Sequence, residues 1–307
     1  MSGLILSIGE AMVELSQAGQ RDLWRLGVAG DTLNTAWYLR RLLDADWRVG
    51  YLSRVGTGEF SQKMVDFLDA EGIETAHVAR DPAREIGLYA ISLRDGERSF
   101  SYWRDNSAAK RLAEDATVLD SALEGCRIAY ISGITLAILP DAGRTTLLDA
   151  LGRARTAGCM VVFDPNLRPR LWTDTASMCR WVETAAAGAD LVLPSLDDEI
   201  THFGDVDDRA TMARYLGLGA AQVVIKNGGG PIRFGGVGGE GLVEDLGRAV
   251  PVDTTSAGDS FNAAYLAASL AGASPEDAIR AGHALSREVI RHPGALVREA
   301  LPPQTEG

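Results

Sequence analysis

Val252-Asp253-Thr254-Thr255-Ser256-Ala257-Gly258-Asp259-Ser260-Phe261 is a turn of small residues that leads directly into an apolar run over residues 261–271. The run is rich in Ala and Leu and contains no Pro, so it predicts a buried helix. The first N–H groups of a helix lack internal partners, and the helix dipole adds partial positive charge there. Because Ala257 and Gly258 have almost no side chain, a phosphate can approach these N–H groups closely. The turn also supplies three N-cap candidates: Thr254, Thr255 and Ser256.

Asp259 is the unusual residue of this turn, because it places a carboxylate in the first helical turn, where an anionic ligand would bind. Two interpretations are open. Asp favours first turns of helices in any case, and Gly258 then only eases a tight bend. Alternatively, Asp259 is a general base beside a phosphoryl group that is being transferred.

The composition is that of a globular protein with one large domain, with or without a small appendage. The chain has 307 residues, of which 46% are hydrophobic, and a net charge of −12. This charge argues against non-specific binding to nucleic acid or to an anionic membrane. The three cysteines are widely spaced and form no Cys-x-x-Cys motif, so neither a zinc site nor a disulfide framework is indicated. No leader or membrane-spanning run is found, and we expect a cytoplasmic protein.

From residue 127 to the end of the chain, predicted strands alternate with helices, which favours a parallel sheet covered on both faces. The predicted strands are 4–9, 49–56, 127–132, 160–164, 191–195 and 221–226, and the clearest helices are 60–71 and 141–156. Ligands of such sheets bind at the carboxyl ends of the strands. The polar residues expected there are Asp164, Asn166, Arg168, Ser195, Glu199 and Lys226, together with the turn that carries Asp259.

A hairpin interrupts this alternation. Residues 87–93 and 98–104 are predicted strands joined by Arg94-Asp95-Gly96-Glu97, and Asp-Gly between alternating runs is a strong hairpin signal. With the half-exposed strands 10–17 and 23–28, the hairpin would form a lid beside the main sheet. Alternation places Tyr89, Tyr102 and Arg104 on one face, where they either meet a ligand or only stabilise cross-strand pairs.

A helix through Leu43 follows Ala29-Gly30-Asp31-Thr32-Leu33-Asn34-Thr35-Ala36, with its apolar residues at core-facing spacing. Gly30, Asp31 and Asn34 at its start are either a helix cap or a loop whose N–H groups and Asn34 amide bind hydroxyl groups.

Two nucleotide-binding motifs can be set aside. Residues 236–241 match Gly-x-Gly-x-x-Gly, but predicted strands lie on both sides, whereas the dinucleotide fingerprint requires a following helix. We therefore expect a glycine-rich hairpin there. No Walker-A pattern occurs, which excludes a conventional P-loop NTPase, and the four histidines show no metal-ligand spacing.

Taken together, these segments resemble the ribokinase-like (PfkB family) carbohydrate kinases from Gly9 to about Gly294. Residues 253–259 resemble the carboxyl-terminal signature of that family. Within it, the chain looks most like the kinases that act on 2-keto-3-deoxygluconate, on the evidence of residues 30–36, 102–109, 164–172 and 193–199. The resemblance implies a single three-layer α/β sandwich over residues 1–307, with a mostly parallel central sheet and a small β-sheet lid from about 10–28 and 87–104.

The resemblance also implies site residues. Asp259 matches the catalytic base, and Ala257 and Gly258 match the anion hole. The positions that match sugar-acid contacts are Gly30, Asp31, Asn34, Tyr89, Tyr102, Arg104, Arg168 and Asp259. Those on the nucleotide side are Ser195, Lys226, Gly228, Gly230, Ser256, Ala257 and Gly258. Glu199 matches an acid that organises Mg²⁺ through water.

The implied cofactors are ATP and Mg²⁺, with a monovalent cation such as K⁺ as a further candidate, and the implied partners are a sugar acid and a second copy of the chain. Arginine binds carboxylates bidentately, so Arg104 and Arg168 favour an acidic sugar. Two residues depart from the family pattern: Ala29 replaces a glycine, and Ser195 replaces an asparagine. The alternatives are another sugar kinase of the same family, of fructokinase or ribokinase type, and a non-catalytic sugar-acid-binding protein.

Overall fold

The computed structural model describes residues 2–17, 22–94 and 97–301. Its main sheet has nine strands in the order β13-β12-β11-β10-β9-β8-β1-β4-β5. All neighbours are parallel except at the β11-β12-β13 end, which is antiparallel. The strands are β1 (Gly3–Ile8), β4 (Trp47–Val55), β5 (Val78–Arg80), β8 (Cys126–Ser132), β9 (Met160–Asp164), β10 (Leu191–Val192), β11 (Gln222–Ile225), β12 (Ile232–Gly236) and β13 (Gly241–Val243).

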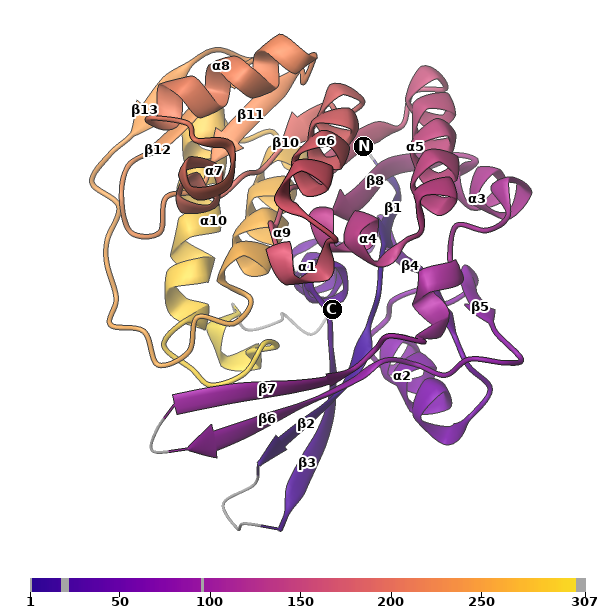
Figure 1. Cartoon of the computed structure of the whole chain (residues 1–307). Helices are drawn as coiled ribbons and strands as arrows, with labels where there is room; N and C mark the ends of the chain where they lie inside the picture. The colour runs from indigo at the N-terminus through magenta and orange to yellow at the C-terminus, as the bar shows by residue number, and fades with distance from the viewer. Residues whose placement is uncertain (1, 18–21, 95–96, 302–307) are drawn as a thin grey trace.

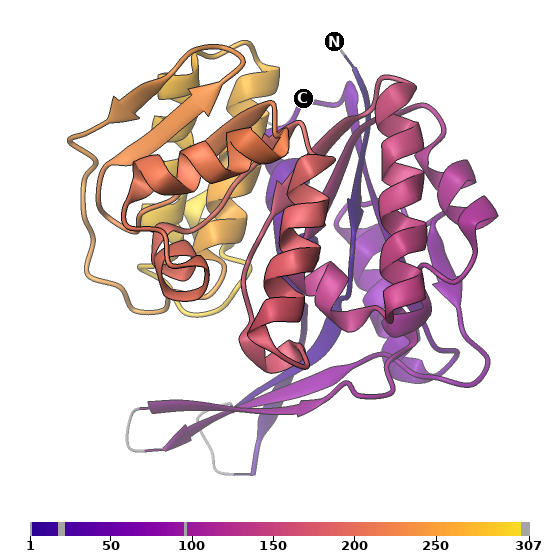
Figure 2. The ribbon, with the colours of Figure 1, turned by 45° about the horizontal axis from the view of Figure 1, so that its top comes forward.

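Helices cover both faces of this sheet and make the three layers seen in Figures 1 and 2. One face carries α1 (Asp31–Leu42), α2 (Glu59–Ala70), α9 (Ala257–Leu270) and α10 (Pro275–Val289). The other carries α3 (Ala116–Leu123), α4 (Gly133–Ile138), α5 (Asp141–Thr156), α6 (Thr175–Ala187), α7 (Leu196–Phe203) and α8 (Asp208–Leu218). Short 3₁₀ turns are η1 (Ala108–Arg111), η2 (Pro169–Leu171) and η3 (Arg298–Ala300).

The core is divided by the pleat of the strands. In β8, Ile128 and Tyr130 pack into the layer of α1 and α9, whereas Ala129 and Ile131 pack into the layer of α5 and α6. Strands buried on both faces therefore appear in the sequence as continuous apolar runs, as expected for a parallel sheet. Among the described residues, no helix combines the length and apolar character that crossing a bilayer requires.

The strand order reverses direction beside β1, since β8 to β11 follow on one side of it and β4 and β5 on the other. Such a switch point is where open α/β sheets bind their ligands. The chain leaves the carboxyl end of β1 directly into β2 of the second sheet, and α1 begins where β3 of that sheet ends. The switch point thus lies next to the second sheet.

This second sheet, which we call the lid sheet, has four strands in the order β3-β2-β6-β7 and projects from the body (Figures 1 and 2). Its strands are β2 (Met12–Gln17), β3 (Trp24–Ala29), β6 (Leu88–Arg94) and β7 (Glu97–Trp103). One face packs Met12, Ala29 and Tyr89 against Ala295 of the body. The predicted small second sheet is confirmed, although the Asp95-Gly96 turn lies outside the described residues.

Most predicted elements lie within one or two residues of those observed. Residues 236–241 form the connection of the antiparallel β12–β13 hairpin, so the dinucleotide fingerprint is correctly set aside. The predicted strand 191–195 is shorter than expected, because β10 ends at Val192 and Ser195 is already the N-cap of α7.

Candidate active site

The turn before α9 is held by one buried carboxylate. Asp253 Oδ1 accepts hydrogen bonds from the backbone N–H and the hydroxyl of Thr255, at 3.0 and 2.7 Å, and Asp253 Oδ2 accepts one from Gly294 N at 2.7 Å. Ser256 is the N-cap residue among the three candidates, in the left-handed region with φ 65°, and its side chain makes no capping bond. The turn therefore presents the N–H groups of the first helical turn from a fixed backbone.

Asp259 faces Asn34 of α1. The Asn34 Nδ2 group donates to Asp259 Oδ2 at 2.8 Å, and both side chains are buried. Burial, and then the negative charge of Asp31, raise the pKa of Asp259 to about 7, while the Asn34 hydrogen bond and Lys226 lower it. A carboxylate with a pKa near neutrality is suited to accept a proton from a hydroxyl group.

Close approach of the backbone explains Gly30, the residue before α1. A Cβ on Gly30 would lie 2.3 Å from the carbonyl oxygen of Glu10, so no larger residue fits there without moving the chain. The preceding Ala29, where the family pattern has glycine, is buried in the lid sheet beside Met12 and Tyr89.

Lys226, at the end of β11, lies on the other side of the same turn. Its ammonium donates to Asp164 Oδ2 at 2.9 Å and to Asn262 Oδ1 at 3.2 Å, and lies 3.5 Å from the position a Cβ on Gly258 would take. The Asn262 amide in turn donates to Asp164 Oδ2 at 2.6 Å and to Tyr130 Oη at 2.9 Å. The carboxyl ends of β8, β9 and β11 thus meet under the start of α9.

The sequence did not predict that Asn262 and Tyr130 belong to the site, and it predicted only that Asp164 lies at the end of a strand. One signal was available for Asn262, which is a fully buried amide in the otherwise apolar stretch 261–268 of α9. A buried amide requires hydrogen-bond partners, but the sequence does not say which ones.

Asp31, in the first turn of α1, is joined to the loop after β9. The Asn166 Nδ2 group donates to Asp31 Oδ2 at 2.8 Å. Burial raises the pKa of Asp31, and nearby Asp164 adds to that effect. The negative charge of Asp164 thus acts on Asp31 and on Asp259, and that of Asp31 acts on Asp259, at this edge of the sheet.

The predicted lid contacts share one face of the lid sheet. Tyr89 and Tyr102 are direct cross-strand partners with ring centroids 5.8 Å apart. Tyr89 is buried and donates to Glu14, whereas Tyr102 is exposed. Arg104, just after β7, forms a buried ion pair with Glu10, a partner that the sequence did not reveal.

Arg168 differs from Arg104 in its surroundings. Its side chain is 52% exposed, donates to the carbonyl oxygen of Leu167 at 2.7 Å and lies 3.9 Å from Asp198. The structure therefore brings one predicted arginine into a buried pair and leaves the other at the surface.

The residues predicted for the nucleotide side lie along two neighbouring loops. Ser195 is bridged to Lys226 by backbone pairing, and the Lys226 carbonyl accepts from Leu196 N at 2.8 Å. Gly228, with φ 50°, is exposed in the loop after β11, and Gly230 N donates to Asn227 O at 2.7 Å. Ser195, Gly228 and Gly230 border the buried Lys226.

Glu199 lies one turn into α7, and its carboxylate faces α8. Its Oε2 accepts from Arg214 at 2.6 Å and from Tyr215 at 2.9 Å, and burial raises its pKa to about 7. Its Oε1 is buried and has no partner among the described residues. Within the same residues no group of three or more His, Cys, Asp or Glu side chains could hold a metal ion.

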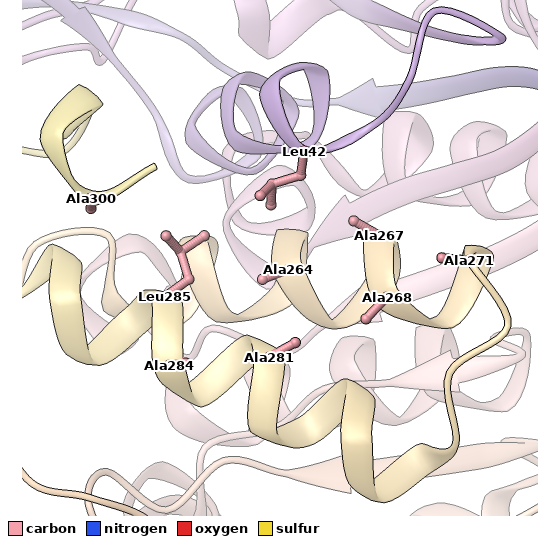
Figure 3. A pocket seen from close by; sticks show the side chains of 9 residues that line it. All are labelled: Leu42, Ala264, Ala267, Ala268, Ala271, Ala281, Ala284, Leu285 and Ala300. Carbon is pink, nitrogen blue, oxygen red and sulfur yellow. The ribbon is translucent and has the colours of Figure 1, made fainter. Parts of the chain in front are cut away.

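A hollow of about 460 Å³ lies between α1, α9, α10 and η3 (Figure 3). Its lining consists of small and apolar side chains: Leu42, Ala264, Ala267, Ala268, Ala271, Ala281, Ala284, Leu285 and Ala300. None of these can donate or accept a proton through its side chain, so this hollow offers no acid–base chemistry.

Comparisons with known proteins point the same way. A model described as pfkB family carbohydrate kinase matches residues 2–300. The chain is 40% identical over 311 residues to the 2-dehydro-3-deoxygluconokinase of Escherichia coli (strain K12), covering 98% of this chain and 100% of that relative. It is 40% identical over 307 residues to the enzyme of the same name from Dickeya dadantii (strain 3937), covering 97% and 98%. The crystal structure of a PfkB protein from Polaromonas sp. JS666 superposes with a TM-score of 0.82 at 27% identity, covering 95% of this chain and 96% of that one.

Proposed function

The chain belongs to the pfkB family of carbohydrate kinases, and we propose that it transfers a phosphoryl group from ATP to the 6-hydroxyl of 2-keto-3-deoxygluconate. The observation that carries the proposal is the buried Asp259 in the first turn of α9, hydrogen-bonded to Asn34 and close to Lys226. The choice of sugar rests on the relatives at 40% identity, whose name denotes this activity.

In the proposed reaction, the oxygen of the 6-hydroxyl forms a bond to the terminal phosphorus of ATP, and Asp259 takes the proton that this hydroxyl loses. The bond from that phosphorus to the bridging oxygen breaks, and ADP leaves with the electron pair. Such a transfer needs positioning and charge neutralisation more than covalent chemistry. The negative charge that develops on the phosphoryl group would be neutralised by the N–H groups of Ala257 and Gly258 and by the ammonium of Lys226.

The sugar acid would bind between α1 and the lid sheet. Gly30, Asp31 and Asn34 present polar groups at the start of α1, and Tyr89 and Tyr102 share the lid face that packs toward the body. Arg104 and Arg168 are proposed to bind the carboxylate, because a guanidinium and a carboxylate form two parallel hydrogen bonds. Closure of the lid sheet would exclude water and limit ATP hydrolysis.

ATP would lie against the loops that carry Ser195, Gly228 and Gly230, with Ser256 and Lys226 toward its phosphates. Mg²⁺ would neutralise phosphate charge, and it is usually held by the phosphates and water rather than by a protein cage. On the resemblance of residues 193–199 to the family, we propose that Glu199 helps to organise Mg²⁺ through water. A requirement for K⁺ is tested by replacing potassium with sodium salts in the assay. We propose that the protein acts in the cytoplasm, where ATP is present as its substrate.

We further propose that the outer face of the lid sheet pairs with a second copy of the chain. By strand alternation, Trp24, Leu26 and Trp103 share the face opposite Tyr89, and they are 40%, 38% and 62% exposed. Exposed apolar patches of this kind mark interaction sites, and most soluble oligomers contain identical chains. Trp103→Glu should turn the oligomer into monomers in analytical ultracentrifugation, and an unchanged sedimentation coefficient would contradict this interface.

The function is tested by coupled ADP release with Mg-ATP, comparing 2-keto-3-deoxygluconate with fructose and ribose. Turnover that is strong only with the keto-deoxy acid supports the proposal. Turnover with a neutral sugar would favour a fructokinase or ribokinase type. A protein that binds the sugar acid but consumes no ATP would be the non-catalytic alternative.

A further inference from the structure

Asp164, the last residue of β9, uses its two carboxylate oxygens in different directions. Its Oδ2 accepts from Lys226 Nζ at 2.9 Å and from Asn262 Nδ2 at 2.6 Å. Its Oδ1 accepts from the backbone N–H of Asn166 at 3.1 Å. The side chain is almost fully buried, and it is not one of the residues assigned above to the sugar or to the nucleotide.

We propose that Asp164 is a positioning residue that ties the phosphoryl side of the active site to the sugar side. One oxygen fixes Lys226 beside the start of α9, and the other fixes the turn whose Asn166 amide holds Asp31. The proposal rests on the proposed kinase function and assigns this residue a role within it.

On the phosphoryl side, the position of Lys226 needs an explanation. Its ammonium lies beside Gly258, at the positive end of the α9 dipole, where a second positive charge is unfavourable by itself. Asp164 offsets that cost with a buried ion pair, and Asn262 fixes the geometry by accepting from Lys226 while donating to Asp164. Two hydrogen bonds thus hold the lysine where an incoming phosphate would meet both the ammonium and the helix N–H groups.

On the sugar side, Asp164 stabilises an uncommon backbone conformation. Asn166 has φ 35°, in the left-handed region that few residues other than glycine adopt. The hydrogen bond from its N–H to Asp164 Oδ1 closes this turn, and the turn directs the Asn166 amide to Asp31 Oδ2 at 2.8 Å. A change at Asp164 therefore reaches Asp31 without direct contact between the two side chains.

A matched aspartate lies at the opposite end of the same sheet. Asp190, before β10, accepts from Arg155 Nε at 2.8 Å and from the backbone N–H of Val161 at 2.8 Å. It combines a basic partner with a backbone partner, as Asp164 does, but far from the carboxyl ends of the strands. Its side chain is 26% exposed, so replacing it reports a lower bound on the structural cost of losing such a carboxylate.

The test compares four variants of the full chain by steady-state kinetics with Mg-ATP and 2-keto-3-deoxygluconate, and by melting temperature. Asp164→Asn should lower kcat at least tenfold and raise KM for the sugar acid at least fivefold. Asn262→Ala removes the amide that fixes Lys226 against Asp164, together with its hydrogen bond to Tyr130, leaves the Asn166 turn intact and should lower kcat alone. Asn166→Gly keeps the backbone conformation and removes only the Asp31 contact, so it should raise the sugar KM alone. Asp190→Asn should lower the melting temperature and leave both kinetic constants unchanged.

The proposal is overturned if Asp164→Asn lowers only the melting temperature, or if the Asn262 and Asn166 variants change the same kinetic constant. Asn262→Ala and Asn166→Gly both keep the Asp164 carboxylate. They therefore still test the proposal if Asp164→Asn does not fold. Calorimetric affinities for a non-hydrolysable ATP analogue and for the sugar acid are measured on the same proteins. Wild type without turnover would contradict the proposed function, whereas equal affinities across the variants would contradict the role of Asp164.

Discussion

The side-chain amide of Asn34 lies 2.8 Å from Asp259 Oδ2, although the two residues are 225 positions apart in the chain. This contact joins the starts of α1 and α9, which contribute the sugar-side and phosphoryl-side residues of the site. An amide that donates to the carboxylate orients it and leaves the other carboxylate oxygen to face a hydroxyl group. Asn34, expected to bind the substrate, is thus also a partner of the proposed base.

The first prediction concerns the base itself. Asp259→Asn should lower kcat by about 10²–10⁴-fold, because general-base catalysis contributes about that factor. Sugar binding should remain, since the shape and the Asn34 contact are kept. Asp277 is the matched control, because it occupies the same third position of α10 that Asp259 occupies in α9. Asp277→Asn should leave kcat unchanged, and near-normal turnover of Asp259→Asn would remove the base assignment.

The second prediction is a pH profile. A base must be deprotonated to act, so kcat/KM should rise with pH through about 7, the pKa to which burial and Asp31 raise Asp259. Asp31→Asn removes a negative charge that raises this pKa, so the rise in kcat/KM should move to lower pH. Asn34→Ala removes a hydrogen bond that lowers the pKa of Asp259, so the rise in kcat/KM should move to higher pH. Shifts in the same direction for both variants would contradict this account.

The third prediction links the same group to stability. The pKa of Asp259 is raised from its ordinary value of 3.8 to about 7, so the folded protein binds this proton more tightly than the unfolded chain does. The contribution of Asp259 to the free energy of unfolding should therefore fall as pH rises from about 4 to about 7. Asp259→Asn should melt at a higher temperature than wild type at pH 8, and the difference should vanish near pH 4. A variant that is less stable at pH 8 would argue against the raised pKa.

The fourth prediction separates stability from turnover at Gly258. A Cβ there would lie 3.5 Å from Lys226 Nζ, an ordinary contact, so Gly258→Ala should fold. Alanine in a helix gains about 0.5–1 kcal/mol over glycine, but the methyl group would stand between the ammonium and the helix N–H groups. We expect a higher melting temperature and a kcat that falls at least tenfold. Gly152→Ala in α5, where nothing lies within 4 Å of the added carbon, should raise the melting temperature without changing kcat.

The fifth prediction contrasts the two arginines. Arg104→Ala leaves the buried Glu10 without its partner and should cost about 3–5 kcal/mol of stability, whereas the exposed Arg168→Ala should cost less than about 0.5 kcal/mol. Both should raise KM for acidic sugars more than for neutral ones, which parallel kinetics with fructose would measure. Equal effects on the two sugar classes would contradict the role of the arginines in binding the carboxylate.

The sequence by itself determined the sheet, the lid sheet and the Asp259 turn. Each of these is encoded locally, by apolar runs of strand length, by alternation beside a turn, and by small residues before an Ala-rich helix. Residues 253–259 alone left an ordinary helix start and a phosphoryl-transfer site as alternatives, and their resemblance to the family signature favoured the second, because the helix start and its acid are contiguous in the chain.

Only the tertiary structure decided which side chains meet. Asp164 with Lys226 and Asn262, Asn34 with Asp259, and Arg104 with Glu10 are pairs formed by residues far apart in the chain. The identity of a polar residue shows that it needs a partner when buried, but the partner depends on strand order and helix packing. Glu199 is a further case. The sequence predicted only that it follows the end of a strand, and the fold determines that Arg214 and Tyr215 of α8 donate to its carboxylate.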